Sequence, residues 1–393
     1  MNVMTRIAHL ADLHIGYSHL ASRAADGRNQ RLVDFEEAAL AAAREAIARK
    51  PDLAVIAGDL LHDTSPAPGA LSGAAGFCQL FEEARIPLLA IGGNHDEAEG
   101  TGRYNALNFL QEHHRLRLYL DQSYIDIADV RLHLVSYRVL SRAQRGRGEI
   151  APIAFSADKP NILVAHGYAP GLGVPVIPEG TETMIPSEWL TDPRFSLCLL
   201  GHIHHHGEIA DHVFYSGSSE RRNFGEAHER PGFYLHTVEP DGSATSESVF
   251  IDQLGAGLPR PMIEHELDTE KLTTSEVAQA VEKMIDAAPP GAMMRVLLHN
   301  VSSELDRSRS RMDWERRHRK AGGFSFEAAV RTRRVSELLD VTFVEPPEDV
   351  GKGLLDFVAE QSYADDVERE QALSLASEVI GEAKDKVLAQ EAD

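Results

Sequence analysis

The chain has 393 residues, of which 43% are hydrophobic and 25% are charged, a composition typical of folded proteins with two or three domains. Its net charge of −22 argues against a protein that simply coats nucleic acid, and its two cysteines are too few for a disulfide framework or a thiolate zinc site. The sequence has no apolar run of membrane-spanning length and no signal-peptide core at its start, so we expect a cytoplasmic protein without membrane contact.

The first half of the chain alternates short apolar runs with helical stretches. Five apolar runs are each predicted to form a buried strand: 7–11, 53–57, 87–91, 162–165 and 197–200. Three stretches between them have helical composition: 31–50, 69–84 and 104–114. Strands that alternate with helices indicate an α/β fold whose largely parallel or mixed sheet is covered by helices on both faces.

The pattern changes after His206. Three segments with turn residues between them predict an antiparallel meander: 212–216, 232–238 and 245–251. A Gly- and Pro-containing linker is expected at 255–261. Beyond it we expect a second unit, with strands at 262–267, 292–298 and near 340–344, and a helix at 274–288. After a break at 345–349, residues 351–389 are predicted to form two acidic amphipathic helices.

A small polar cluster follows each of the five predicted strands. The clusters are Asp12-Leu-His14, Gly58-Asp59, Gly93-Asn94-His95-Asp96, His166-Gly167 and Gly201-His202-Ile203-His204. A single polar residue at a strand end is usually a cap, but the carboxyl ends of parallel strands meet at one edge, so five clusters should converge there. Residues i and i+2 of an extended segment point the same way. Both members of the pair Asp12 and His14, and both members of the pair His202 and His204, are therefore expected to reach one ion.

The residue types in these clusters favour metal binding. Asp, Asn and His side chains without cysteine suit Mn²⁺, Fe or Zn²⁺. Seven ligands, out of the nine such side chains in the clusters, are too many for one ion, but they suit two ions about 3.5–4 Å apart that share a carboxylate. The sequence therefore predicts a two-metal site.

In their order, these blocks resemble the calcineurin-like metallophosphoesterase superfamily over about residues 6–206. Within it, the chain is most similar to the SbcD-type DNA-repair exonucleases, the nuclease partners of the SbcC SMC-like ATPase. Three segments carry this narrower resemblance: the opening His9-Leu-Ala-Asp-Leu-His-Ile-Gly16, His62 three residues after Asp59, and Tyr215-Ser-Gly-Ser-Ser-Glu-Arg-Arg-Asn-Phe-Gly-Glu226.

The resemblance implies a role for each matching residue. One divalent ion, with Mn²⁺ the expected metal, would be held by Asp12, His14 and His204. The other would be held by Asn94, His166 and His202, with Asp59 bridging. His95 and His62 would be catalytic histidines that bind no metal, and Asp96 would orient a neighbouring group. His205 and His206 extend the histidine run beyond the family pattern and are interpreted as rim residues.

The resemblance also implies a fold and an activity. We expect a β-sandwich flanked by helices over 1–258, a small α+β capping domain that contacts DNA over 262–345, and C-terminal helices that bind a partner over 350–393. The expected activity is DNA exonuclease and endonuclease cleavage in double-strand break repair or DNA end processing, together with an SbcC-like ATPase. A small-molecule phosphodiesterase or phosphomonoesterase on the same scaffold is the alternative, and a binding protein with a decayed site is a weaker one.

Two further surfaces are predicted. Residues 307–334 carry ten basic and three acidic residues, so Arg316, Arg317 and Arg319, with Trp314 nearby, are predicted to contact the DNA backbone, unless they form a solvated helix face. The resemblance implies a homodimer through the helices at 69–84 and 104–114, where Leu71, Phe77, Leu80 and Phe81 could supply the apolar face. The alternative for these four residues is ordinary packing against the sheet.

Overall fold

The structure, a computed structural model, describes residues 3–20, 22–96, 106–172, 182–255, 257–301 and 310–331, together with Ser374 and Ser377. The chain divides into two compact units, Met1–Arg331 and Thr332–Asp393. The strand predicted near 340–344 and, apart from two serines, the helices predicted over 351–389 lie outside the described residues.

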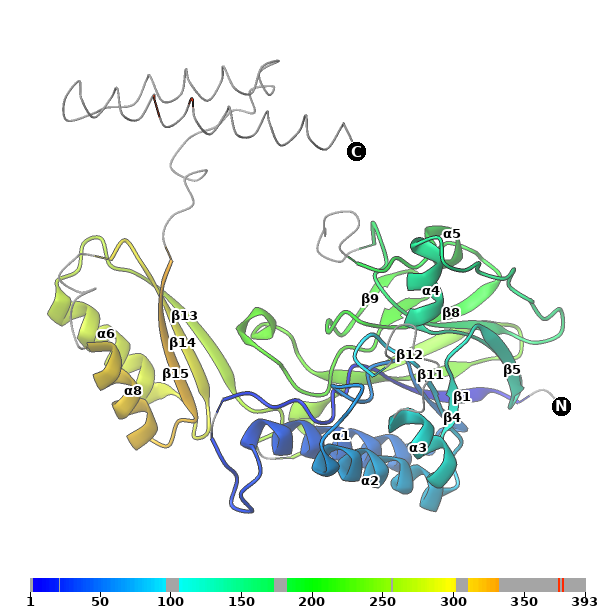
Figure 1. Ribbon diagram of the computed structural model, residues 1–393, viewed down its shortest axis with the longest axis horizontal. Helices are drawn as coiled ribbons and strands as arrows, with labels where there is room; N and C mark the ends of the chain where they lie inside the picture. The colour runs from blue at the N-terminus through cyan, green and yellow to red at the C-terminus, as the bar shows by residue number, and fades with distance from the viewer. Residues whose placement is uncertain are drawn as a thin grey trace. The chain divides into compact units, whose positions relative to one another are not determined.

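Two six-stranded sheets form the body of the first unit (Figure 1). The first sheet has the order β12-β11-β1-β2-β3-β4. Its four parallel strands are β1 (Thr5–Leu10), β2 (Leu53–Ile56), β3 (Leu88–Ile91) and β4 (Arg117–Tyr119). The antiparallel pair β11 (Gly232–Val238) and β12 (Ala244–Phe250) completes it, with β11 paired to β1.

The second sheet has the order β5-β6-β7-β8-β10-β9. The strands β6 (Val130–Val135), β7 (Asn161–His166), β8 (Phe195–Gly201) and β10 (Val213–Tyr215) are parallel, and β5 (Ser123–Ile127) and β9 (Gly207–Ala210) are antiparallel edges. All five strands predicted before His206 are therefore present. They are divided between two sheets, which confirms the β-sandwich flanked by helices that the resemblance implied, whereas the strand pattern alone indicated one sheet. The predicted meander is wrong for 212–216, because β10 pairs with β8 while β11 and β12 join the first sheet.

The two sheets pack face to face. Successive side chains along a strand point to opposite faces of its sheet, and both faces of the central strands are covered. On β2, Leu53 and Val55 point into a core shared with Leu132 and Val164 of the second sheet. The alternate residues Ala54 and Ile56 point to the outer face, where helices cover them. A strand buried on both faces is therefore mostly apolar, and its buried polar residues, such as His9 and His133, have hydrogen-bond partners.

Helices cover the outer faces of the sandwich. On the first sheet these are α1 (Gln30–Ala48), α2 (Pro68–Ala84) and α3 (Ala106–His113). On the second sheet α4 (Tyr137–Gln144) and the short α5 (Ser187–Leu190) pack over β7 and β8. Two 3₁₀ turns, η1 (Phe224–Glu226) and η2 (Ile251–Gln253), lie on either side of β11 and β12.

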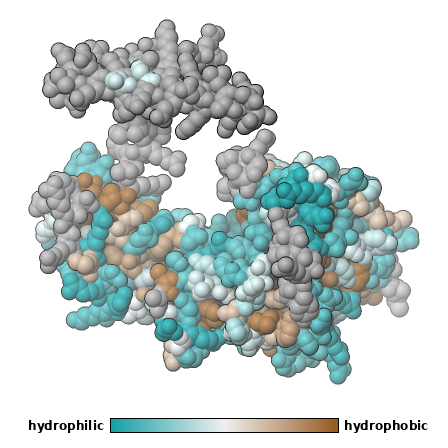
Figure 2. All heavy atoms as spheres, in the orientation of Figure 1, coloured by the Kyte–Doolittle hydropathy of each residue, from teal (hydrophilic) through white to brown (hydrophobic). Residues whose placement is uncertain are grey.

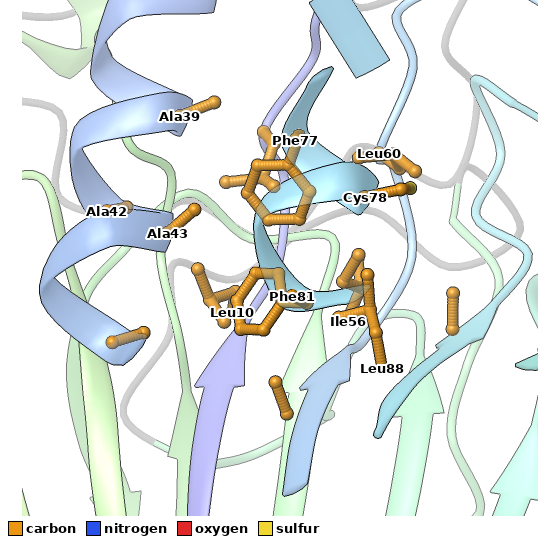
Figure 3. Close-up of a cluster of buried hydrophobic side chains, with 14 of the residues drawn as sticks. Leu10, Ala39, Ala42, Ala43, Ile56, Leu60, Phe77, Cys78, Phe81 and Leu88 are labelled. Carbon is orange, nitrogen blue, oxygen red and sulfur yellow. The ribbon is translucent and has the colours of Figure 1, made fainter. Parts of the chain in front are cut away.

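Figure 3 shows that α2 packs inward through its aromatic residues. Phe77 and Phe81 are fully buried, against Leu10 of β1 and Ile56 of β2 and against the alanines of α1. The prediction that these two residues supply a dimer surface is wrong, because the same side chains complete the chain's own core. Leu71 and Leu80 are half-buried at the edge of this core.

A smaller α+β layer follows the linker. Its parallel strands β13 (Met262–Asp268), β14 (Met293–His299) and β15 (Ser325–Arg331) form one sheet, and α6 (Thr274–Ala287) and α8 (Ser310–Lys320) cover one face of it (Figure 1). Trp314 is 2% exposed in the core between the helices and this sheet. Its buried side chain is therefore not itself available to contact DNA. We call this layer, residues 262–331, the cap.

Seven large hydrophobic side chains of the described residues are exposed. In the view of Figure 2, hydrophilic residues cover most of the face that is drawn, with hydrophobic residues in small groups between them. Among the described residues, no helix combines the length and the apolar character that crossing a membrane requires.

Candidate metal centre

The polar clusters that follow β1, β2, β3, β7 and β8 meet at one end of the sandwich. Hydrogen bonds between the loops extend the parallel pairing of β1 and β2: the amide of Asp12 donates to Gly58 (3.2 Å), and that of His14 donates to Asp59 (3.0 Å). From the second sheet, the amide of His202 donates to both carboxylate oxygens of Asp12 at 3.0 Å. The predicted convergence is therefore present, at the shared edge of two sheets.

The backbone of the predicted ligands is locally strained. Asp12 (φ 51°), His14 (φ 43°), Asp59 (φ 52°) and His202 (φ 104°) all adopt positive φ values, which residues with a Cβ rarely do. The loops turn sharply directly after their strands, so the extended i, i+2 geometry predicted for the two His-containing pairs does not hold. Strain of this kind persists only where surrounding contacts impose it, and it is common at functional sites.

The first group of donors comprises Asp12, His14 and His204, whose ligand atoms lie close enough together to hold one metal ion. The Nε2 atoms of His14 and His204 are 2.9 Å apart. Two neighbouring ligands at right angles, each about 2.1 Å from one ion, would be about 3 Å apart. Glu226 accepts a hydrogen bond from Nδ1 of His204 (2.9 Å), which leaves Nε2 of that ring as a free donor atom for a metal.

The second group comprises Asn94, His166 and His202. Oδ1 of Asn94 lies 3.0 Å from Nε2 of His166 and 3.0 Å from Nδ1 of His202, the same ligand-to-ligand spacing. The outward nitrogen of each ring is already satisfied. Nδ1 of His166 donates to the carbonyl of Ala57 (2.7 Å), and Nε2 of His202 pairs with Glu182 (2.8 Å). Both rings are thus held with their second nitrogen directed at Asn94, in the centre of the group.

Asp59 lies between the two groups and is 2% exposed. Its Oδ2 is 3.7 Å from Nε2 of His14, in the first group, and 3.5 Å from Nε2 of His166, in the second. Its Oδ1 accepts a hydrogen bond from the amide of His95 (2.9 Å). This is the position that a bridging carboxylate would occupy.

The pKa values of His166 and Asp59 show that the buried carboxylates of this centre favour a positive charge beside them. Burial lowers the pKa of His166, but the carboxylates of Asp59 and Asp12 outweigh it and raise that pKa to about 9. Burial raises the pKa of Asp59, yet His166 and His14 more than compensate and the pKa falls far below its usual value. A cation that binds here competes with the proton on His166.

Two glycines are required by this packing. Gly58 has a φ of 91°, and a Cβ there would lie 2.1 Å from Nδ1 of His166. A Cβ on Gly93 would lie 2.1 Å from Oδ1 of Asp59. The glycines that precede Asp59 and Asn94 in the sequence blocks therefore leave room for ligand side chains.

Asp96 holds the two ligand loops together. Its Oδ1 accepts from the amide of Gly93 (2.8 Å) and its Oδ2 from the amide of Leu60 (2.7 Å). Burial, together with the charge of Asp59, raises the pKa of Asp96 to about 7. The contacts of Asp96 with backbone amides fit the predicted role of orienting a neighbouring group.

The two predicted catalytic histidines lie beside the first group. The ring of His95 stacks on that of His62 at a centroid distance of 4.8 Å and meets His14 edge-on at 4.8 Å. Nδ1 of His95 donates to the carbonyl of His62 (3.0 Å), so Nε2 is the nitrogen available on the other side of the ring. Nδ1 of His62 is 3.3 Å from Nδ1 of His14. His14, His62 and His95 are also close enough to form a metal-binding group.

Three residues of the site were not predicted. Glu226 and Glu182 orient the two ligand histidines of the His202-Ile203-His204 block, and Arg222 approaches Nε2 of His95 at 3.4 Å. Arg222 and Glu226 lie in or beside the family-typical segment after β10, so a signal for them was present in the sequence. Glu182 belongs to no recognised block, and only the folded chain brings it to His202.

A pocket of about 600 Å³ lies at this centre, and its lining includes Asp59, Asn94, His95, His202, His204 and Arg222. The candidate metal ligands are nitrogen and oxygen atoms at the spacing expected around one ion. In His166, His202 and His204, the ring nitrogen that faces away from the group has a hydrogen-bond partner. The residues present therefore fit divalent cations. Such a pocket, with imidazoles beside the metal-binding groups, suits hydrolysis of a phosphate ester.

Replacing Glu226 with Gln should weaken metal binding by about 10–100-fold, because the amide no longer fixes and polarises the imidazole of His204. Equilibrium dialysis against Mn²⁺ measures the effect. Glu229→Gln is the matched control, since Glu229 pairs with the rim residue His205, outside both groups. Equal metal affinities for the two variants would contradict the role given to Glu226.

The predicted DNA-contacting arginines are not brought to this pocket. Arg316 pairs with Asp313 (2.6 Å) and Arg319 with Glu315 (2.9 Å) on the exposed side of α8. Arg317 joins α8 to α6 through Asp286 (2.6 Å) and Glu282 (3.0 Å). The opposite face of the cap sheet is the one that contacts η1, where Arg295 lies over the ring of Phe224.

Comparisons with known proteins agree with the motifs. Residues 5–206 match the calcineurin-like phosphoesterase family, a range that contains all seven predicted ligands. The DNA double-strand break repair protein Mre11 of Haloferax volcanii is 31% identical over 243 residues, or 61% of this chain and 50% of that protein. The protein of the same name from Archaeoglobus fulgidus is 35% identical over 92 residues, or 23% of this chain and 19% of that protein.

The aligned regions thus span about half of the Haloferax protein and about a fifth of the Archaeoglobus protein. The match to the family covers more than half of the present chain, and the two-sheet sandwich and the donor groups accord with it. The resemblance predicted from the sequence blocks is confirmed, and the chain belongs to the calcineurin-like phosphoesterase family.

Proposed function

We propose that this protein is a metal-dependent DNA nuclease that cleaves DNA phosphodiesters in double-strand break repair or end processing. The observation that carries the proposal is that seven Asp, Asn and His side chains meet at one end of the sandwich, in two groups with Asp59 between them. The Mre11 relatives are DNA double-strand break repair proteins, which supports DNA as the substrate.

The chemistry would be divided between ions and protein. Two divalent ions, with Mn²⁺ the expected metal, would supply a nucleophilic water and neutralise phosphate charge. Asp12, His14 and His204 would hold one ion and Asn94, His166 and His202 the other, with Asp59 shared. His95 would deliver a proton from Nε2 to the departing oxygen, since its Nδ1 is held by the carbonyl of His62. His62 would support this ring by stacking on it.

The exposed arginines of α8 are proposed to contact DNA away from the reacting phosphate. Changing Arg316 and Arg319 together to Gln should weaken DNA binding at low salt. For duplex DNA, removing one phosphate interaction should reduce the slope of log affinity against log salt by about 0.9. Fluorescence anisotropy over a salt series measures the slope.

Two controls separate this effect from a structural one. Arg44→Gln changes an exposed arginine of α1 and should leave the slope unchanged. Arg317→Gln removes the ion pairs between α8 and α6, so a thermal melt shows whether the cap is loosened. An unaltered slope in the Arg316/Arg319 variant would favour a solvated helix face.

Two partners are also proposed, an ATPase and a second copy of this chain. An SbcC-like SMC-type ATPase is the proposed partner, bound by the acidic segment 350–393, which lies outside the described residues apart from Ser374 and Ser377. A cytoplasmic homodimer is also proposed, without the two buried phenylalanines of α2 in its interface.

The function is tested with a digestion panel in Mn²⁺. Linear, hairpin and circular DNA are compared with bis(4-nitrophenyl) phosphate, each with and without ATP and an SMC-type ATPase. Cleavage of linear or hairpin DNA supports the nuclease. Hydrolysis of the small diester alone would identify the alternative, a small-molecule phosphodiesterase.

A further inference from the structure

Arg222 is a cation in the metal-centre pocket that forms no ion pair with a carboxylate in the described part of the chain. Its side chain is half-buried and lines the pocket, and no ion pair joins its guanidinium to a described acidic residue. Its Nη1 lies 3.4 Å from Nε2 of His95, a long contact, and its Nε is buried with no hydrogen-bond partner among the described groups. Leaving a buried donor unpaired is costly unless another molecule satisfies it.

The neighbouring arginines contrast with Arg222. Nε of Arg221 donates to the carbonyl of Glu229 (2.7 Å). Arg230 makes a two-pronged pair with Asp252 (2.7 and 2.9 Å). Arg260 does the same with Asp34 at 2.6 Å. Arg222, the arginine that lines the pocket among the described residues, has no comparable partner for its guanidinium group.

The backbone of Arg222 is held firmly. Its amide donates to Oε2 of Glu226 (2.7 Å), the carboxylate that also orients His204, and its carbonyl accepts from the hydroxyl of Tyr17 (3.0 Å). The cap supports the same turn, since Arg295 lies 4.7 Å over the ring of Phe224. The guanidinium is therefore presented to the pocket from a fixed point, which reduces the entropy cost when it binds a ligand.

A planar cation beside two metal-binding groups suits an oxyanion. A guanidinium matches the oxygen geometry of a phosphate and donates through a fixed fork, and such donors contribute most where charge develops in the reaction. We infer that Arg222 binds a non-bridging oxygen of the phosphoryl group that is hydrolysed, on the side of the pocket occupied by His95. This inference rests on the proposed phosphoester hydrolysis and names a residue outside the predicted site.

The test compares Arg222→Ala and Arg222→Lys with Arg230→Ala, whose arginine belongs to the same segment but is paired outside the pocket. Each variant is assayed for bound Mn²⁺, for affinity for inorganic phosphate by calorimetry on Mn²⁺-loaded protein, and for kcat/KM on bis(4-nitrophenyl) phosphate and linear DNA. Arg222→Ala should keep its metals, bind phosphate at least about tenfold more weakly, and lose about 10²–10³-fold in kcat/KM on both substrates. Arg222→Lys should recover part of each loss, and Arg230→Ala should behave as the parent.

Three results would overturn the inference. Unchanged phosphate affinity and unchanged hydrolysis of the small diester would show that Arg222 does not contact the reacting group. A loss confined to DNA would place Arg222 at a neighbouring phosphate, and loss of metal would make it a support for Glu226. If the parent protein cleaves the small diester but not DNA, the proposed nuclease function fails, while the small-diester and phosphate measurements still decide the role of Arg222.

Discussion

His95→Asn is expected to lower kcat for phosphodiester hydrolysis by about 10²–10⁴-fold, the usual contribution of a general acid. The side chain of His95 touches the first metal-binding group only through ring contacts, and its Nδ1 is already used by the carbonyl of His62. Asn cannot deliver a proton from the position of Nε2. Because the amide of residue 95 still donates to Asp59, the variant should keep its metals.

Metal analysis by mass spectrometry is measured beside the rate. His228→Asn, at an exposed position, is the control for loss of an imidazole. One outcome would contradict this role, because His14, His62 and His95 are close enough together to hold an ion themselves. If His95→Asn loses one ion along with its activity, His95 is a ligand and the proton must come from elsewhere.

Asp59→Asn is expected to remove both ions and therefore all metal-dependent hydrolysis. The Oδ2 atom of Asp59 is the atom that faces both groups, at 3.7 Å from His14 and 3.5 Å from His166. A neutral amide supplies neither the negative charge nor two equivalent acceptor oxygens. The loss should exceed that of Glu226→Gln, which changes the orientation of one ligand only.

Calorimetric titration with Mn²⁺ measures this change. Asp63→Asn, four residues further on and exposed, is the matched control and should bind metal normally. A thermal melt of the metal-free proteins separates metal loss from unfolding. Two ions bound at parental affinity in Asp59→Asn would exclude a bridging role.

Much of the fold could be predicted because burial on both faces requires continuous apolar runs. The strands at 53–57, 87–91 and 197–200 were found in this way, and each is followed by site residues. The apolar pattern alone does not give the number of sheets, because an apolar run that faces a second sheet has the same composition as one that faces a helix; the β-sandwich was implied by the family resemblance. The meander prediction for 212–216 is wrong because the sequence pattern does not show which strands pair. In the structure β10 pairs with β8, and β11 pairs with β1.

The side chains of the centre were predicted because polar residues directly after buried strands are conspicuous. How they group was decided by the tertiary structure. Periodicity predicted that His202 and His204 reach one ion, yet His202 lies by Asn94 and His204 by His14. The positive φ at His202 ends the extended geometry on which that prediction depended.

The sequence by itself determined which residue types follow the buried strands, and with them the metal chemistry and the family. Only the tertiary structure decided that two sheets share the edge, that Asp59 faces both groups, and that Glu182, Glu226 and Arg222 complete the pocket. These three residues lie on segments without strand periodicity, and Glu226 meets His204 only because the chain turns back after β10. The local sequence pattern indicates whether a segment is buried. A contact between two distant segments instead depends on how every intervening element packs.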